Sequence, residues 1–237
     1  MKRSLIPSEE NPHPLLDLQG QERRNFVIRS IFITTFMTLV IYVLWPNYYI
    51  LESIITKSSV AVLDIFGFKS RIFVYEDSLQ EVSSLDRFLM RLYDPSRVTY
   101  PAISMDTPYG RSNYLIVRAC TGMQAGALLL GLIWSTPATL HDRIRASYVM
   151  LLSLYIGNIL WIAAQIGMVL ILINNFGVVY VTAWAYAHDW TGKPIGFFGT
   201  IAFTILIEMR NVKILDTITV WIDWITGAKP KTAVTKS

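Results

Sequence analysis

The sequence predicts an all-α integral membrane protein, a polytopic helical bundle of about four to six membrane segments with a small extracytoplasmic insert. Of its 237 residues, 53% are hydrophobic and only 16% are charged, which excludes an ordinary soluble domain. Several apolar stretches are long enough to cross a hydrocarbon core of ~30 Å. The basic residues, with a net charge of +4, gather near the ends of those stretches, as the positive-inside rule describes.

Residues 1–25 are polar and contain prolines, so they lack the apolar core of a signal peptide and are expected in the cytoplasm. Residues 26–68 are expected to hold the first transmembrane helix, Ser30 to Leu51, which is free of charged side chains and spans ~33 Å as a helix. Glu52 and Lys57 interrupt the apolar stretch that follows. That stretch is therefore either a short partner helix or an interfacial helix.

Residues 69–112 differ in composition, because charges of both signs alternate with turn formers such as Thr107-Pro108. We interpret them as a water-facing, extracytoplasmic insert. The run from Arg71 to Glu76 predicts one strand. Apolar residues at helical spacing over 85–92 predict one amphipathic helical stretch.

Residues 113–210 form the predicted transmembrane core, and residues 211–237 an amphipathic and basic cytoplasmic tail. The core is free of charge over long runs. Its predicted parts, in chain order, are a crossing over 115–134, a turn from Pro137 to Arg145, a long crossing over 146–173, a break at 174–177, a short apolar piece up to His188, and a last crossing over 194–207.

The basic clusters predict the orientation. The N-terminal segment, the loop with Arg143 and Arg145, and the tail all carry basic residues, which places them on the cytoplasmic side if the crossings alternate. We therefore expect a multi-pass protein of the cell membrane. The same basic residues form no Lys/Arg-rich stripe, so no nucleic-acid partner is expected.

The single cysteine, Cys120, marks a candidate site. It lies early in the crossing predicted over 115–134, at the same depth as Asn158 and Trp161 on the next helix. Neighbouring antiparallel helices would bring these residues together near the outer surface, with His188 just before the last crossing. Each also has a structural interpretation: Cys120 as a small packing residue, Asn158 as an interhelical hydrogen-bond former, and His188 as an interfacial anchor.

The sequence motifs around these residues are more specific than the residue types alone. The run Ala119-Cys120-Thr121-Gly122-Met123-Gln124, followed by Gly157-Asn158 and by His188-Asp189-x-x-Gly192, resembles the exosortase/archaeosortase family of membrane cysteine transpeptidases. The resemblance covers about residues 113–205. It implies that Cys120 is the nucleophile and that His188 completes the site. The supporting residues it implies are Thr121, Gly122, Gln124, Asn158, Trp161 and Arg118.

The sequence departs from the family at one position. The family motif Asn-x-x-Arg reads Asn158-Ile-Leu-Trp161 here, so an indole replaces the arginine that assists the cysteine. A thiol with a pKa near 8.5 needs a neighbouring base or cation to become a nucleophile at neutral pH. Arg118 or Arg111 is an alternative source of charge if residues 115–119 are extended. Arg143 and Arg145 are expected at the opposite membrane face.

The resemblance also implies the reaction. Such an enzyme cleaves the C-terminal sorting signals of exported proteins through a cysteine thioester and transfers the product to a lipid or another cell-envelope acceptor. The alternative is a relative that has lost catalysis and serves as a subunit of a membrane protein complex, since Trp161 suits packing better than charge stabilisation. No cofactor or metal is expected, because three scattered histidines and one cysteine offer no ligand cluster.

Overall fold

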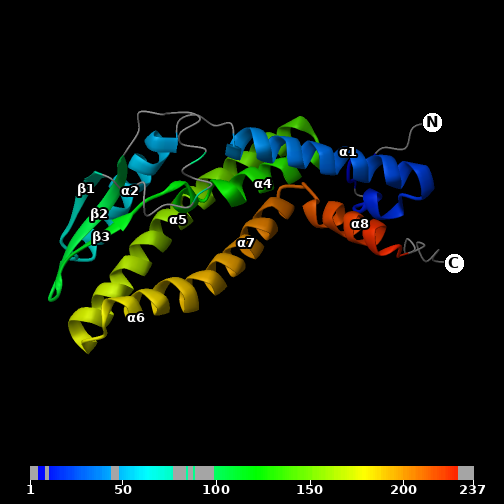
Figure 1. The fold of residues 1–237 in the computed structure, drawn as a ribbon. Helices are drawn as coiled ribbons and strands as arrows, with labels where there is room; N and C mark the ends of the chain where they lie inside the picture. The colour runs from blue at the N-terminus through cyan, green and yellow to red at the C-terminus, as the bar shows by residue number, and fades with distance from the viewer. Residues whose placement is uncertain are drawn as a thin grey trace. The chain divides into compact units, whose positions relative to one another are not determined.

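The computed structural model describes residues 5–8, 11–43, 48–76, 84, 88 and 99–228. The chain is mostly helical (73%), and Figure 1 shows the order of its elements. Its contacts divide it into two compact units. The first comprises Met1–Tyr42, Ala125–Ser153 and Thr200–Ser237, and the second comprises Val43–Gln124 and Leu154–Gly199. Each unit is described by itself.

Three helices in the described part of the chain are long and apolar enough to cross a membrane: Gly20–Ile41, Leu140–Phe176 and Tyr180–Glu208. Much of their apolar surface faces outward. Phe32 and Phe198, for example, are 68% and 65% exposed. Apolar surface on this scale is costly in water but is matched by lipid. The chain is therefore a helical membrane protein, while the predicted number of four to six segments stays a prediction.

In the first unit, helix α1 (Gly20–Thr38) lies close to helix α4 (Met123–Ser135). Helix α1 continues as a π-helical turn, η2 (Leu39–Val43). A Cβ atom on Gly131 would lie 2.8 Å from the main-chain oxygen of Thr34. Only glycine permits this approach of the two backbones. The Thr34 hydroxyl also donates to Ser135 Oγ at 3.0 Å, so the contact combines close packing with a buried hydrogen bond.

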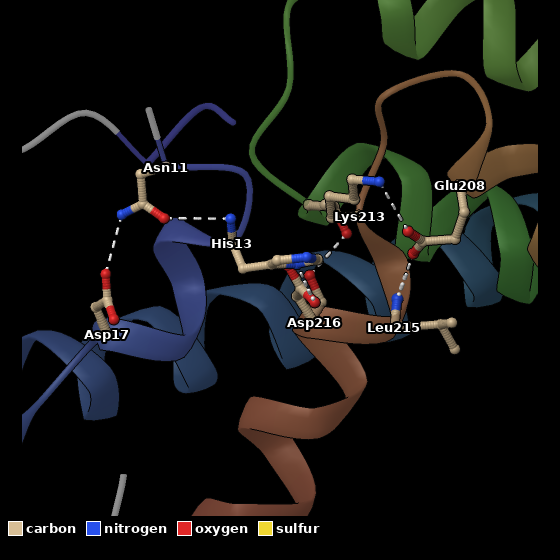
Figure 2. Close-up of polar contacts among 9 residues, drawn as sticks. Asn11, His13, Asp17, Glu208, Lys213, Leu215 and Asp216 are labelled. Carbon is tan, nitrogen blue, oxygen red and sulfur yellow. Dashed lines mark hydrogen bonds and ion pairs between the residues drawn. The ribbon is translucent and has the colours of Figure 1, made fainter. Parts of the chain in front are cut away.

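Helix α8 (Ile214–Thr226) packs against α1 and the short 3₁₀ helix η1 (Pro14–Asp17). Trp221 donates to Ser30 Oγ at 2.7 Å, and the buried carboxylate of Asp216 lies 2.9 Å from His13 Nδ1 (Figure 2). The predicted amphipathic tail is thus a helix tied to the N-terminal segment.

Glu208 marks the turn that leads into α8. Its carboxylate lies 3.6 Å from Lys213 Nζ and accepts the main-chain N–H of Leu215 at 2.8 Å (Figure 2). A carboxylate near the first turn of a helix stabilises the free N–H groups there. The turn between Glu208 and α8 is therefore fixed by its own side chains.

In the second unit, helix α2 (Tyr48–Ile65) packs on an antiparallel three-stranded sheet. Its strands are β1 (Ser70–Glu76), β2 (Thr99–Thr107) and β3 (Gly110–Leu115), in that order. Ile103 of the central strand pairs with Ile72 and Tyr114. The buried core of this unit joins the sheet to α2 and to the later helices through the residues Ile55, Leu63, Ile103, Met105, Tyr114, Ile116, Ile162, Ile166, Val169, Leu170 and Ile173.

The remaining elements complete the membrane helices. A 3₁₀ turn η4 (Arg118–Thr121) precedes α4, and α5 (Leu140–Phe176) runs through both units. Gly177, with φ of +62°, ends α5 at the predicted break. One continuous helix follows, made of α6 (Tyr180–Trp184), the π-helical segment η5 (Ala185–Gly192) and α7 (Lys193–Glu208).

Three predicted boundaries were wrong. The first helix begins at Gly20 rather than Ser30, because the charged residues before Ser30 are good helix formers and hydropathy marks only the apolar part of a helix. The crossing over 115–134 is the 13-residue helix α4, ~20 Å long and short of a full span. The short apolar piece predicted up to His188 and the last crossing predicted over 194–207 are parts of one helix, Tyr180–Glu208.

The insert was predicted in part. Strand β1 confirms the strand predicted over 71–76, and a tight turn at Thr107-Pro108 joins β2 to β3. Strand β2 escaped prediction because it contains Pro101 and is buried without alternation from Tyr100 to Met105, so it lacks the period of two. Of the amphipathic stretch predicted over 85–92, all but Phe88 lies outside the described residues.

Candidate functional site

A cavity of about 530 Å³ in the second unit brings together five of the predicted site residues, namely Cys120, Gln124, Asn158, Trp161 and His188; Thr121, Gly122 and Arg118 are not among its described lining residues. Cys120, Asn158 and His188 all contribute to its wall, although they come from a turn, from α5 and from the π-helical segment. The lining residues are Tyr114, Leu115, Ile116, Cys120, Gln124, Asn158, Trp161, Ile162, Gln165, Ile166, Trp184, His188 and Gly192. The cavity combines apolar walls with a thiol, an imidazole and three amides, a composition typical of a small-ligand or substrate site.

Cys120 lies in the η4 turn before α4, not within a membrane helix as predicted. Its N–H donates to Val117 O at 2.8 Å, and Gly122 closes the turn with φ of +70°. This left-handed conformation favours glycine. The prediction that Cys120 lies inside a membrane crossing, at the same depth as Asn158, is therefore wrong. The chain turns at Gly122 before α4 begins.

The predicted meeting of Cys120 and Asn158 is nevertheless observed. Asn158 Nδ2 on α5 donates a hydrogen bond of 2.5 Å to the main-chain oxygen of Cys120. A Cβ atom on Gly122 would lie 3.6 Å from the Asn158 side chain, so the turn packs directly on this amide. Thr121 is buried beside it. The turn that carries the thiol is thus held by α5.

The thiol itself is partly exposed. Its sulfur lies 3.9 Å from the main-chain oxygen of Leu115, the last residue of β3. A thiol is a weak donor, so this contact orients the Cys120 side chain without holding it tightly. The sulfur therefore remains accessible from the cavity.

His188 lies on the wall formed by the η5 segment. Its ring stacks on Trp184, with centroids 5.1 Å apart and planes 16° apart, and its Nδ1 lies 3.3 Å from the Asp189 carboxylate. The side chain is 48% exposed. A carboxylate at one ring nitrogen favours a proton there and leaves the other nitrogen as an acceptor, which is the arrangement a general base requires.

Tyr114 extends the aromatic wall from the sheet. Its ring centroid lies 5.5 Å from that of Trp184 and 6.2 Å from that of Tyr180. Burial, with a smaller contribution from Tyr180, raises the pKa of the Tyr114 phenol above its ordinary value. Tyr114 therefore stays neutral across the physiological range.

Gly192 allows the two facing helices to approach at the cavity. A Cβ atom on Gly192 would lie 2.6 Å from Gln165 Nε2 and 3.4 Å from Trp161 Cζ2. Any larger residue would displace the amide, the indole, or both. The Gln165 amide is thereby held between α5 and the η5 segment, at the edge of the cavity.

No lysine or arginine is among the described residues that line the cavity. Arg111, one alternative source of charge, is exposed and pairs with Asp106 at 3.3 Å. The side chain of Arg118 lies outside the described part of the chain. Trp161, which stands where the family motif has its arginine, does line the cavity. A cation beside the thiol is therefore not observed in the described structure.

Within the described residues no group of three His, Cys, Asp or Glu side chains gathers in a way that could hold a metal ion. Comparisons with protein-family models, with curated proteins and with solved structures found no match for this chain. The function must therefore be argued from the site itself.

Two site residues were missed at the level of sequence. Trp184 lies four residues before His188, a spacing at which helical side chains meet, and this signal was available. Tyr114 gave none, because it reaches the cavity from a strand that was not predicted. The catalytic and supporting roles of the predicted residues stay predictions.

Proposed function

We propose that the chain is a membrane cysteine peptidase and transpeptidase that cleaves the C-terminal sorting signals of exported proteins. One observation carries the proposal: a turn bearing the single thiol is clamped by Asn158 and shares a cavity of about 530 Å³ with His188. The resemblance to the exosortase/archaeosortase family rests on the same residues. The helical membrane fold is compatible with a substrate that is itself anchored in the membrane.

The proposed reaction proceeds in two steps. His188 accepts the proton of the Cys120 thiol, and the thiolate attacks the scissile carbonyl to form a tetrahedral intermediate. Collapse of the intermediate breaks the C–N bond, His188 returns the proton to the leaving amine, and a thioester remains. A nucleophile of a cell-envelope acceptor, a lipid or another envelope component, then attacks the thioester. His188 accepts the proton of this nucleophile, the C–S bond breaks, and the released Cys120 thiolate takes the proton back to restore the thiol.

The cavity offers amide groups for the oxyanion of this intermediate. The Asn158 amide already donates to the Cys120 carbonyl, so we assign the oxyanion to the side-chain amide of Gln124 or Gln165, which also line the cavity. Removing one such donor typically costs about 10²- to 10³-fold in rate. A loss of this size in a Gln165→Ala or Gln124→Ala variant identifies the donor.

We further propose that the Cys120 turn faces the extracytoplasmic side of the cell membrane. With the N-terminal segment, the Arg143 loop and the tail in the cytoplasm, the four to six segments leave the Cys120 turn on the extracytoplasmic side of the cell membrane. An exported polypeptide then reaches the thiol after translocation. Labelling of Cys120 in intact cells by a membrane-impermeant maleimide tests this orientation directly.

The decisive test uses the fact that the chain has one cysteine. Cells that produce the wild-type, Cys120→Ser or His188→Ala protein are compared for processing of exported proteins with a C-terminal membrane segment and a basic tail. We expect processing only in cells that produce the wild-type protein. In these cells we also expect a substrate linked to Cys120 as a thioester, which hydroxylamine releases. Equal processing in the Cys120→Ser strain overturns it.

A second candidate function is favoured by Trp161. An indole in the cavity, with no lysine or arginine among its described lining residues, suits a relative that has lost catalysis and acts as a non-enzymatic subunit of a membrane complex. This candidate expects an unreactive thiol and stable co-purification with other membrane proteins. Thioester accumulation on Cys120 excludes it.

A further inference from the structure

A second cavity, of about 230 Å³, lies in the first unit between α1, α4 and the start of α5. It is large enough for a ligand bigger than one water molecule, whose share of liquid volume is ~30 Å³. Two of its lining residues are arginines and none is acidic. The lining residues are Leu5, Phe26, Arg29, Ser30, Trp134, Ser135, Pro137 and Arg143.

Arg143 is incompletely satisfied in this cavity. Its Nη2 donates to Thr136 O at 3.0 Å, but its Nε is buried and has no hydrogen-bond partner among the described residues. A buried donor of a charged group without an acceptor is costly and rare. The described residues therefore leave this donor without an acceptor.

Arg29 faces the same cavity and adds a second positive charge. Within the described chain no carboxylate forms an ion pair with it, and it lines the cavity together with Arg143. Two like charges that share one cavity destabilise each other unless an anion lies between them.

Four acids of the first unit are engaged elsewhere. Asp142 accepts the Thr139 hydroxyl at 2.6 Å. Asp223 pairs with Arg23 at 3.5 Å, Asp216 faces His13, and Glu208 faces Lys213 (Figure 2). None of these four carboxylates forms an ion pair with Arg29 or Arg143.

We propose that this cavity is a phosphate-binding site, in which the guanidinium groups of Arg29 and Arg143 bind the phosphate of a lipid headgroup or a free phosphate. Guanidinium groups match phosphate in geometry and charge. Arg143 lies in the first turn of a candidate membrane span, and Arg29 directly precedes the charge-free run 30–51. Basic residues at such positions meet the headgroup layer, where Trp134 and Phe26 suit the apolar part of a lipid.

The test uses the full-length protein in detergent and three probes. These are inorganic phosphate, phosphatidylglycerol and the zwitterionic phosphatidylcholine, each titrated while the bound species are counted by native mass spectrometry. We expect phosphate or phosphatidylglycerol to bind. The Arg29→Gln and Arg143→Gln variants should each weaken that binding about 10- to 100-fold. The Arg145→Gln variant, whose residue is exposed and does not line the cavity, should bind as the wild type does.

The outcomes separate the sources and can overturn the site. Binding of inorganic phosphate without lipid assigns a free phosphate, and binding of phosphatidylglycerol alone assigns a headgroup. Because Arg143→Gln also loses the bond to Thr136, the Arg29→Gln variant provides the decisive comparison, since the Arg29 side chain is exposed. The proposal fails if neither inorganic phosphate nor phosphatidylglycerol binds, or if the Arg29→Gln variant binds them as tightly as the wild type does. That failure leaves the Cys120 proposal untouched.

Discussion

The side-chain amide of Asn158 donates to the main-chain oxygen of Cys120 across 2.5 Å. The bond joins the middle of α5 to the turn before α4, and it fixes the turn rather than the thiol. The sulfur lies 3.9 Å from Leu115 O. Asn158 therefore positions the thiol through the backbone of its turn.

Replacement of Asn158 by alanine should loosen the Cys120 turn. Loss of one partly buried hydrogen bond typically lowers the free energy of unfolding by about 1 kcal/mol. Thermal denaturation in detergent measures this loss, and the rate of iodoacetamide labelling of Cys120 should change with it. The matched control is Asn174→Ala, at an exposed position near the end of α5. Equal melting temperatures for the two variants would contradict the clamp.

The Trp161→Arg change should activate the thiol. It places a cation in the cavity that Cys120 lines, and a nearby cation favours the thiolate. We expect alkylation of Cys120 at pH 7 to become roughly tenfold faster. The Trp161→Gln variant controls for loss of the indole and should show no such gain. A rate that does not rise above that of Trp161→Gln would mean that position 161 does not act on the sulfur.

The Gly131→Ala change should separate α1 from α4. The added Cβ would lie 2.8 Å from Thr34 O and 2.9 Å from Thr34 Cα, and a backbone cannot yield as the end of a side chain does. Overpacking of this kind costs about 1–3 kcal/mol of folding free energy. In Gly199→Ala, where no atom lies within 4 Å of the added group, better helix propensity should give a neutral or slightly stabilising effect. A higher melting temperature for Gly131→Ala would refute the close approach.

Tyr114 should make the protein sensitive to alkali. Burial raises the pKa of its phenol above that of the unfolded chain, which is near 10. The folded state therefore binds the proton more tightly. The free energy of unfolding does not depend on this proton below about pH 10, the pKa in the unfolded chain. Above that pH it falls by up to about 1.4 kcal/mol per pH unit.

The measurement is the melting temperature between about pH 9 and 11. Tyr114→Phe removes the ionisable group and should lose less stability over this range than the wild type. Tyr109→Phe, at a position that is 67% exposed, should follow the wild type. Parallel curves for Tyr114→Phe and the wild type would show that Tyr114 does not titrate differently on folding.

The membrane class and the main break could be predicted, because both rest on local composition. A charge-free run is visible in any sequence, and Gly177 ends α5 where a glycine after a polar pair predicts an end. Helix lengths were less accessible. Gly122 ends the turn that carries Cys120 and delays α4, but an isolated glycine in an apolar run does not reveal whether it adopts a positive φ.

The meeting of Cys120, Asn158 and His188 was predicted although the route to it was wrong. The prediction placed Cys120 within a crossing, whereas the chain reaches the same cavity from a turn after β3. The contribution of Tyr114 could not be found, because its strand β3 pairs with β2, and β2 was not predicted. Strand β2 is buried without alternation from Tyr100 to Met105, so it gives no period-two signal.

The π-helical segment from Ala185 to Gly192 has a consequence for the helix that contains it. A wide turn accommodates a residue more than an α turn does, so the loss of one residue there can be absorbed by a return to α geometry. The helix on both sides of the segment would then keep nearly the same orientation, because the wide turns hold the extra residue. The same deletion in the α-helical parts of this helix would rotate one side by about 100° relative to the other. The η5 segment is therefore the part of the helix that tolerates a one-residue change of length with the least rotation of its two ends.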